Sequence, residues 1–96
     1  MPDGGVLVVV EVEAVRDAAT LKSYQQGARE QIDRYGGKVL ARGGSTLEGM
    51  PYGPLLVQSW PSEQAFVAWQ ESADYQPLRE MRRSCADLRI AVIPLL

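Results

Sequence analysis

The chain has 96 residues, of which 46% are hydrophobic and 23% charged, and its formal net charge is −2. These values fit one globular domain over residues 1–96 and exclude a disordered or a membrane-spanning chain. The charge balance supplies no basic surface for a phosphate backbone, so we expect no nucleic-acid partner. The sequence has no histidine, which excludes Ser/His/Asp and Cys/His nucleophile systems and His-ligated zinc or haem. We therefore expect neither a metal nor a cofactor.

Cysteine usage and the start of the chain indicate the compartment. The single cysteine, Cys85, allows no internal disulfide, as is usual in a reducing cytoplasm, and we expect it to pack as a small hydrophobe. The apolar run Val6–Val10 is short, has no basic segment before it and ends at Glu11, which is typical of a strand and not of a signal peptide. We therefore expect a cytoplasmic protein with no membrane partner.

The first half of the chain is predicted to form a strand, a helix and a second strand. The β-branched residues 6–13 are typical of a strand that is covered on both faces. Asp17 stands where a helix cap belongs, and apolar side chains at steps of three and four predict a helix that ends at Gly36-Gly37. Alternation predicts a short strand over Lys38–Arg42, before a long glycine-rich connection to Pro54. The helix residues expected to pack in the core are Leu21, Tyr24, Ala28, Ile32 and Tyr35.

The second half is predicted to form a strand, a broken helix and a last strand. The third strand covers Leu55–Trp60, and Ser62 begins a helix in which Phe66 and Trp69 are expected to pack in the core. This helix is interrupted before Asp74, which we expect to cap a further helix that runs through Cys85. The fourth strand is predicted at residues 88–95.

The order of these elements is β-α-β-β-α-β, which predicts an α+β, ferredoxin-like subunit. Right-handed crossovers give an antiparallel sheet of order 4-1-3-2 with the helices on one face. The other face would expose a large apolar area, which usually marks an interface. Two sheets packed face to face would cover it in a symmetric homodimer that closes a barrel. The residues expected on this face are Leu7, Val9, Leu40, Leu56, Trp60, Ala91 and Ile93.

Several short motifs, taken in order, point to a known family. They are Tyr35-Gly36-Gly37-Lys38-Val39-Leu40-Ala41-Arg42-Gly43-Gly44, Leu47-Glu48-Gly49, Trp60-Pro61-Ser62, Ala68-Trp69 and Ser72-Ala73-Asp74-Tyr75-Gln76. The set covers nearly the whole chain and resembles domain-of-unknown-function family 1330 of the dimeric α/β-barrel superfamily. The resemblance implies a ferredoxin-like subunit and a homodimer, and little about chemistry.

The resemblance also has departures that bear on function. Ser59-Trp60-Pro61-Ser62 stands where such proteins often have Glu-Phe-Pro-Ser, so a carboxylate is missing at that strand position. The wider superfamily includes cofactor-free monooxygenases, haem-degrading enzymes and small-molecule isomerases. Its haem-dependent members use histidine ligands, which this chain lacks.

Strand alternation selects the candidate site residues. If Val6, Val8 and Val10 face the helices, the barrel side of each strand carries one or two polar groups in an apolar wall. The residues predicted on that side are Leu7, Val9, Glu11, Glu13, Leu40, Arg42, Leu56, Gln58, Trp60, Arg89, Ala91 and Ile93, whereas Val39 and Ala41 are predicted to face the helices. The strand directions place Glu11, Arg42 and Arg89 at the same end of the sheet. The connection after the second strand, which carries Glu48 and Tyr52, is expected next to that end. The expected ligand-binding residues are Glu11, Arg42, Glu48, Tyr52, Tyr75 and Arg89, and their chemistry suits a small anionic or enolic organic molecule in the barrel interior.

Structural roles are open for the same residues. Glu11 and Arg89 are neighbours across the sheet and would neutralise each other at the dimer seam. Arg42 would equally tie down the connection that follows it, and the ring of Tyr75 would pack in the core with its hydroxyl near the cavity mouth.

Three functions are compatible with this sequence. The first is a cofactor-independent enzyme, such as an oxygenase, isomerase or cyclase, in which an arginine stabilises an oxyanion and Glu11 or Glu48 moves a proton. The second is a protein that binds a similar molecule without chemistry, which the same residues fit equally well. The third is a structural protein with a filled barrel. An open or filled interior distinguishes the third function from the first two.

Overall fold

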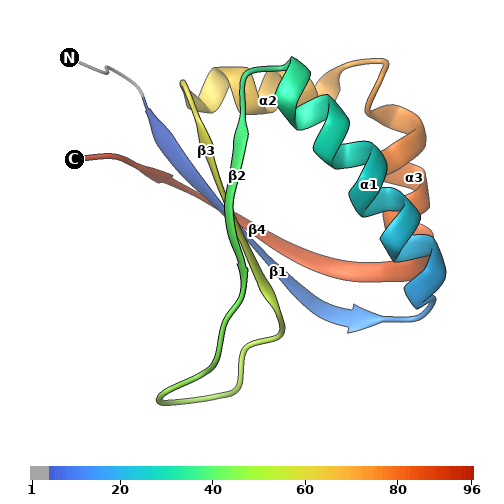
Figure 1. Cartoon of the computed structure of the whole chain (residues 1–96), viewed down its shortest axis with the longest axis vertical. Coiled ribbons are helices and arrows are strands. Elements are labelled where there is room, and N and C mark those ends of the chain that lie inside the picture. Colours follow the sequence, from blue (N-terminus) through green and yellow to red (C-terminus); the bar gives the residue numbers. More distant parts are fainter. Residues whose placement is uncertain (1–4) are drawn as a thin grey trace.

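The computed structural model describes residues 5–96, and Figure 1 shows a sheet with all its helices on one side. In chain order the elements are β1 (Val6–Val15), α1 (Ala18–Arg34), β2 (Lys38–Gly43), β3 (Leu55–Trp60), α2 (Glu63–Glu71), α3 (Gln76–Cys85) and β4 (Ala86–Pro94). The sheet is antiparallel and its order is β2-β3-β1-β4, which is the predicted order read from the other edge. The α+β, ferredoxin-like prediction is confirmed.

The predicted caps begin the first two helices. The carboxylate of Asp17 accepts a hydrogen bond from the N–H of Thr20 at 3.1 Å, and the hydroxyl of Ser62 accepts one from the N–H of Ala65 at 3.0 Å. Such caps satisfy N–H groups that have no partner inside the helix. The break between α2 and α3 was also predicted.

The prediction that Asp74 caps α3 is wrong. The turn after α2 gives Tyr75 helical backbone angles, so Tyr75 occupies the cap position and makes no side-chain cap. The carboxylate of Asp74 instead accepts a hydrogen bond from the hydroxyl of Tyr35 at 2.9 Å. The proline in the first turn has no N–H group, so it leaves one donor fewer to be satisfied at this helix end. α3 begins without a capping side chain.

The core lies between the sheet and the helices and is rich in aromatic rings. Val6, Val8 and Val10 face it from β1, as predicted. The rings of Trp60 and Trp69 are stacked with their centroids 5.5 Å apart, and other rings pack around them. The further aromatic members of this cluster are Phe66 and Tyr75, with Tyr24 and Tyr35 partly buried against it. Cys85 is fully buried beside Leu21 and Ala86, so its predicted packing role is confirmed.

The predicted facing of β3 is wrong. Gln58 pairs with Val8, Trp60 with Val6, and Leu56 lies opposite Val10. Directly opposed residues share a face, so Leu56, Gln58 and Trp60 point towards the helices. The run Leu55-Leu56-Val57 has no polar alternation to fix its facing, and the aromatic side chains of α2 select Trp60 as their partner.

A β-bulge reverses the facing of β2 partway along the strand. Val39 pairs with Gln58, but Ala41 pairs with the next residue of β3, Val57, which leaves Leu40 as an extra residue. After a one-residue bulge, alternate side chains exchange faces. Arg42 therefore lies opposite Leu56 and points towards the helices, whereas Ala41 points away. Both assignments correct the prediction from strict alternation.

The face of the sheet opposite the helices is apolar and uncovered. The register confirms the predicted facing of Leu7, Val9, Ala91 and Ile93, and Leu40 and Ile93 have 54% and 46% of their surface exposed. The corrected register adds Ala41, Leu55 and Val57 to this face. We call these residues together the open sheet face. No helix within residues 5–96 is long and apolar enough to cross a membrane.

Candidate functional site

A cavity of about 380 Å³ lies between the sheet and α1. Its apolar wall comes from the core sides of the strands and helices. The apolar lining residues include Val10, Val12, Leu21, Ala28, Ile32, Val39, Leu56, Phe66, Trp69, Leu88 and Ile90. A ligand was predicted in a barrel interior between two sheets, whereas this cavity lies within a single chain, on the helix side of its sheet.

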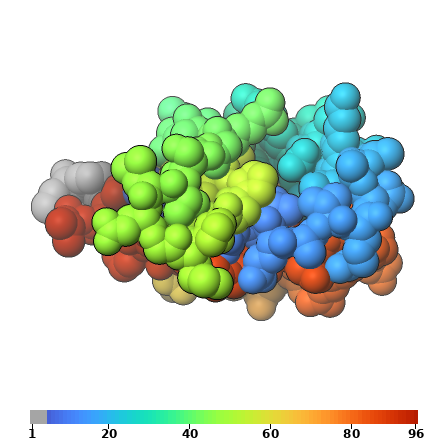
Figure 2. Space-filling model, turned by 90° about the horizontal axis from the view of Figure 1, so that it is seen from below, coloured from blue at the N-terminus to red at the C-terminus, as the bar shows by residue number. Residues whose placement is uncertain are grey.

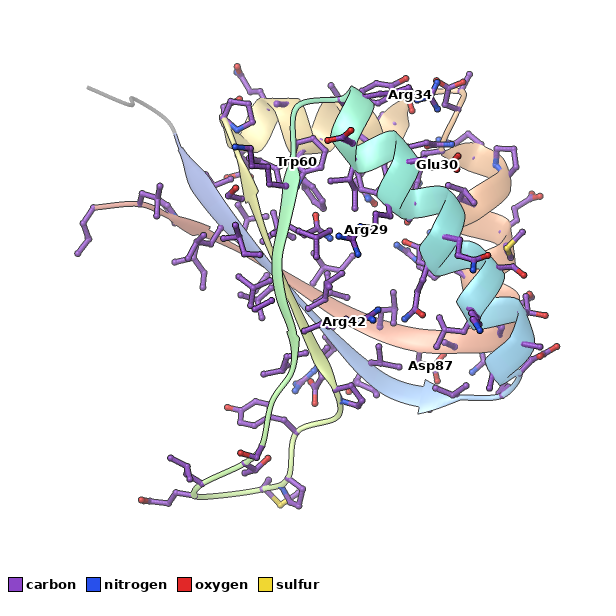
Figure 3. The ribbon with its side chains drawn as sticks, in the orientation of Figure 1. Arg29, Glu30, Arg34, Arg42, Trp60 and Asp87 are labelled. Atoms are coloured by element: carbon purple, nitrogen blue, oxygen red, sulfur yellow. The ribbon has the colours of Figure 1, made fainter. Side chains whose placement is uncertain are left out.

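Two arginines line the cavity from opposite sides. Figure 3 shows Arg29 reaching from α1 and Arg42 from β2 into the space between sheet and helix. Both are exposed, and within residues 5–96 neither takes part in a salt bridge. Guanidinium groups bind carboxylates and enolates through charge-assisted hydrogen bonds. Their position therefore favours an anionic ligand.

The side-chain amide of Gln58 is a buried donor in the cavity wall. Only 4% of Gln58 is exposed, and its Oε1 accepts a hydrogen bond from Nε1 of Trp60 at 2.8 Å. Because an indole nitrogen can only donate, this bond identifies the amide oxygen and leaves the NH₂ group on the other side. The NH₂ group has no hydrogen-bond partner in the described part of the chain, and Gln58 lines the cavity. It is thus available to a ligand oxygen.

Tyr75 lies behind the cavity wall, since it is fully buried and does not line the cavity. Its hydroxyl lies 2.8 Å from that of Tyr24, which does line the cavity, and accepts a hydrogen bond from Nη1 of Arg82 at 2.8 Å. Burial is the main cause that raises the pKa of Tyr24, with Tyr75 adding to it, so the Tyr24 phenol stays neutral. Tyr75 was predicted to contact a ligand, but in the structure Tyr24, and not Tyr75, lines the cavity.

The predicted pair of Glu11 and Arg89 is present on the open sheet face. These residues are direct cross-strand neighbours, and Nε of Arg89 donates to Oε1 of Glu11 at 2.7 Å. Oε2 of Glu11 accepts a hydrogen bond from the N–H of Gly53 at 2.9 Å. This backbone bond first, and then Arg89, lowers the pKa of Glu11. Glu11 thus holds the connection between β2 and β3 against β1, away from the cavity.

Glu48 and Tyr52 lie on the connection between β2 and β3, which extends beyond the sheet (Figure 1) and borders β1 in the view from below (Figure 2). Both are exposed, and neither lines the cavity. The N–H of Tyr52 donates to the hydroxyl of Thr46 at 2.9 Å, so this contact is internal to the connection. Among the sequence-predicted site residues, Arg42 alone lines the cavity.

Arg29 and Gln58, like Gln25 and Gln70, line the cavity but were not among the predicted site residues. Arg29 follows the buried Ala28 at the edge of the apolar stripe of α1, a position where arginines are usually solvated. Gln58 was singled out as a polar residue but was assigned to the other face. A polar residue in an apolar strand was the available signal for Gln58, and no signal distinguished Arg29.

We expect the carboxylate of Glu11 to make stability depend on pH. The lowered pKa means that its contribution is complete above the ordinary value of 4.5 and is lost as the pH falls through the lower pKa of the folded state. Glu11→Gln should therefore lower the melting temperature at pH 7, with a smaller difference from the wild type at pH 3. Thermal unfolding followed by circular dichroism at both pH values measures this, and a difference that stays constant with pH would contradict the assignment.

Together the polar cavity groups are rich in donors and lie in an apolar wall. Arg29 and Arg42 only donate, and the amide oxygen of Gln58 is already bonded to Trp60, while Gln25 and Gln70 add amides that can both donate and accept. No group of three or more potential metal ligands is present within the described residues. Such a wall suits an apolar molecule that carries an anionic or carbonyl oxygen.

Comparison with known proteins supports the fold assignment. The profile of DUF1330, described as a domain of unknown function, matches residues 5–96. No protein among those of curated function matches the chain.

Solved structures resemble the fold at low sequence identity. A protein of unknown function from Rhodopseudomonas palustris has a TM-score of 0.83 and 21% identity, over 98% of this chain and 84% of that chain. SnoaB, a cofactor-independent oxygenase from Streptomyces nogalater, has a TM-score of 0.63 and 11% identity, over 96% and 91%. A dimeric protein of unknown function and ferredoxin-like fold from Bacteroides fragilis has a TM-score of 0.60 and 11% identity, over 97% and 98%. At these identities the comparisons establish the ferredoxin-like fold.

Proposed function

Since the chain belongs to the DUF1330 family of domains of unknown function, we infer its activity from the cavity and propose that the protein binds a small organic anion there. The ligand has an apolar body, which fills the cavity, and a carboxylate or enolate group near Arg29 and Arg42. The observation that carries this proposal is the pair of guanidinium groups without a carboxylate partner among residues 5–96, on the wall of an apolar cavity. The free NH₂ group of Gln58 supports it.

Binding fits the cavity better than proton transfer does. Within the described residues the lining contains no carboxylate and no lysine that could serve as a general base. The tyrosine in the lining, Tyr24, has a raised pKa, so it remains protonated at neutral pH. SnoaB is a cofactor-independent oxygenase, and oxygen uptake in the presence of a bound quinol would reveal such an activity in this protein.

We also propose that the protein is a homodimer joined through the open sheet face. This face is apolar and uncovered by any element within residues 5–96, and burial against a second copy would remove it from water. The dimeric ferredoxin-like protein from Bacteroides fragilis shows that a similar fold forms dimers. In this arrangement the cavities lie on the outer sides of the paired sheets, one in each subunit.

Ligand binding is tested with a matched pair of probes, 2-naphthoate and its neutral analogue 2-naphthalenemethanol. Trp69 lines the cavity, so quenching of its fluorescence reports occupancy. We expect naphthoate to bind at least about tenfold more tightly than the alcohol, because a charge-assisted hydrogen bond contributes about 1.5–3 kcal/mol. Equal affinities for the two probes would contradict the proposal.

Arg42→Gln is expected to weaken naphthoate binding about tenfold, and Arg42→Lys less, because lysine keeps the charge but lacks the planar fork. Arg29→Gln should act in the same direction. Arg34→Gln is the matched control, since Arg34 is an exposed arginine of α1 that does not line the cavity. A lower melting temperature with unchanged naphthoate affinity would show that Arg42 anchors the connection instead.

A further inference from the structure

We propose that Tyr24 selects ligands that carry a carbonyl oxygen, because its hydroxyl donates a hydrogen bond into the cavity in a direction fixed by Tyr75 and Arg82. The ligand class is then an anion with a separate carbonyl acceptor, such as a hydroxyquinone or a ring-fused enolate. This inference rests on the proposed binding function and adds a selectivity that the arginines do not provide. Tyr24 is the residue that touches the ligand, whereas Tyr75 and Arg82 are positioning residues.

The direction of the hydrogen bonds follows from Arg82. A guanidinium group can only donate, so Nη1 of Arg82 donates to the hydroxyl oxygen of Tyr75 at 2.8 Å. The proton of Tyr75 must then go to another acceptor. Tyr75 is fully buried, and the other hydrogen-bonding atom near its hydroxyl within residues 5–96 is the oxygen of Tyr24, at 2.8 Å.

The opposite direction would leave a buried proton without a partner. If Tyr24 donated to Tyr75, the oxygen of Tyr75 would accept from both Arg82 and Tyr24, and its own proton would have no acceptor. Buried hydroxyl groups are nearly always hydrogen-bonded, since an unmade bond costs the desolvation of the group. The favoured direction is therefore from Arg82 to Tyr75 and from Tyr75 to Tyr24.

Tyr24 then has a proton to donate. Its oxygen accepts from Tyr75 and lies near the guanidinium of Arg82, which can only donate, so no acceptor for the proton of Tyr24 occurs among the described residues. Tyr24 lines the cavity, so a ligand oxygen is the acceptor that the structure leaves open to it. The guanidinium of Arg82 also polarises the chain of hydroxyl groups, which strengthens the donor at its end. Burial, which is the main cause of the raised pKa of Tyr24, keeps this phenol protonated.

Gln58 and Tyr24 supply two kinds of donor to one ligand. Gln58 donates from the sheet and Tyr24 from α1, while the arginines supply the positive charge. A carboxylate alone satisfies the arginines but leaves the tyrosine proton without an acceptor. A ligand with an added carbonyl oxygen satisfies both.

The selectivity is tested with two probes that share a bicyclic body. 2-Hydroxy-1,4-naphthoquinone is an enolate at neutral pH with carbonyl oxygens, whereas 2-naphthoate has a carboxylate and no further carbonyl. We expect Tyr24→Phe to weaken binding of the hydroxynaphthoquinone about tenfold and that of naphthoate less than twofold. Tyr75→Phe should reduce the same selectivity to a smaller extent, because Tyr24 keeps its hydroxyl and loses only its fixed direction. Tyr35→Phe is the matched control, since the hydroxyl of Tyr35 bonds to Asp74 and Tyr35 does not line the cavity.

The outcomes separate this inference from the proposed function. If Tyr24→Phe weakens both probes equally, Tyr24 acts by packing and the inference is overturned, while the binding function stands. If neither probe binds, or if the arginine variants leave naphthoate binding unchanged, the proposed function fails. Binding to the Tyr24 hydroxyl is also expected to shift the visible absorption band of the hydroxynaphthoquinone. Arg82→Gln should reduce both this shift and the selectivity for the hydroxynaphthoquinone over naphthoate. Arg82→Lys should restore both.

A measurement without ligand tests the direction of the hydrogen bonds directly. With ¹³Cζ-labelled tyrosine in mixed H₂O and D₂O, a slowly exchanging hydroxyl gives separate signals for its two isotopic forms. We expect separate signals for Tyr75, whose proton is held between the rings, and a single averaged signal for Tyr24, whose proton faces the cavity. A slowly exchanging Tyr24 hydroxyl in the ligand-free protein would overturn the inference.

Discussion

Replacing Val57 by aspartate is expected to abolish the dimer, leaving a monomer or an unfolded chain. Val57 lies on β3 in the middle of the sheet and pairs with Val9 on one side and Ala41 on the other. In a symmetric dimer the change buries two unpaired carboxylates near one another, and an uncompensated buried charge costs about 3–5 kcal/mol. The dissociation constant should therefore rise by at least about a hundredfold. Sedimentation velocity over a range of protein concentrations measures the change.

Val67→Asp is the matched control for this experiment. Val67 lies on α2, has 39% of its surface exposed and is on the opposite side of the molecule from the open sheet face. The same substitution there should leave the dimer intact. A Val57→Asp protein that still sediments as a dimer would place the interface elsewhere, and a wild type that remains monomeric at high concentration would refute the dimer.

Replacing Gly53 by alanine is expected to destabilise the protein by about 3 kcal/mol. A Cβ atom at Gly53 would lie 1.9 Å from the backbone oxygen of Val12, and a strand backbone cannot move aside as a side chain can. The clash would lift the connection from β1, and Glu11 would lose its hydrogen bond from the N–H of Gly53. The bond from the N–H of Val12 to the oxygen of Pro54, at 3.0 Å, would be lost with it. For a chain of this length the melting temperature should fall by at least about 10 °C.

Gly49→Ala provides the comparison within the same connection. Gly49 has φ +86° and no atom within 4 Å of the position of a Cβ atom, so alanine there meets backbone strain alone. That strain is about 1–2 kcal/mol, and the change in melting temperature should be correspondingly smaller. If Gly53→Ala melts at or above the temperature of Gly49→Ala, the connection is not held against β1 in the way described. Glu11→Gln removes the carboxylate without introducing a clash. Its melting temperature therefore separates the loss of the Glu11 hydrogen bond from the effect of the clash at Gly53.

The topology of this protein was predictable from local signals. Caps at Asp17 and Ser62, the paired glycines after α1 and the β-branched runs each mark a boundary that the structure reproduces within a few residues. Once the order of elements is known, the handedness of the crossovers leaves one sheet order. The pair of Glu11 and Arg89 was predictable as well, because neighbouring antiparallel strands fix which residues face each other.

The facing of β2 and β3 could not be predicted from these signals. Both strands lack a clear polar side, so alternation alone gives two equivalent assignments, and the choice depends on packing against the aromatic side chains of α2. A bulge leaves one residue of a strand unpaired, and no residue type in the sequence marks its position. Arg42 was therefore assigned to the other face by strict alternation. The hydrogen bond between the hydroxyl groups of Tyr24 and Tyr75 could not be predicted either, because it depends on how α1 packs against the segment before α3.

The bulge at Leu40 makes strand pairing, and not sequence alone, a determinant of what a cavity contains. If Leu40 paired with Val57, Ala41 would turn towards the helices and Arg42 towards the open sheet face, so a guanidinium would leave the cavity although every residue of the chain would be kept. Deleting Leu40 would instead leave Val39 and Arg42 on the helix side, because only the unpaired residue is removed. A relative of the same length without the bulge would therefore present a different side chain to its ligand, although an alignment would show no gap. Comparisons of ligand preference within the family have to be made by register, strand by strand.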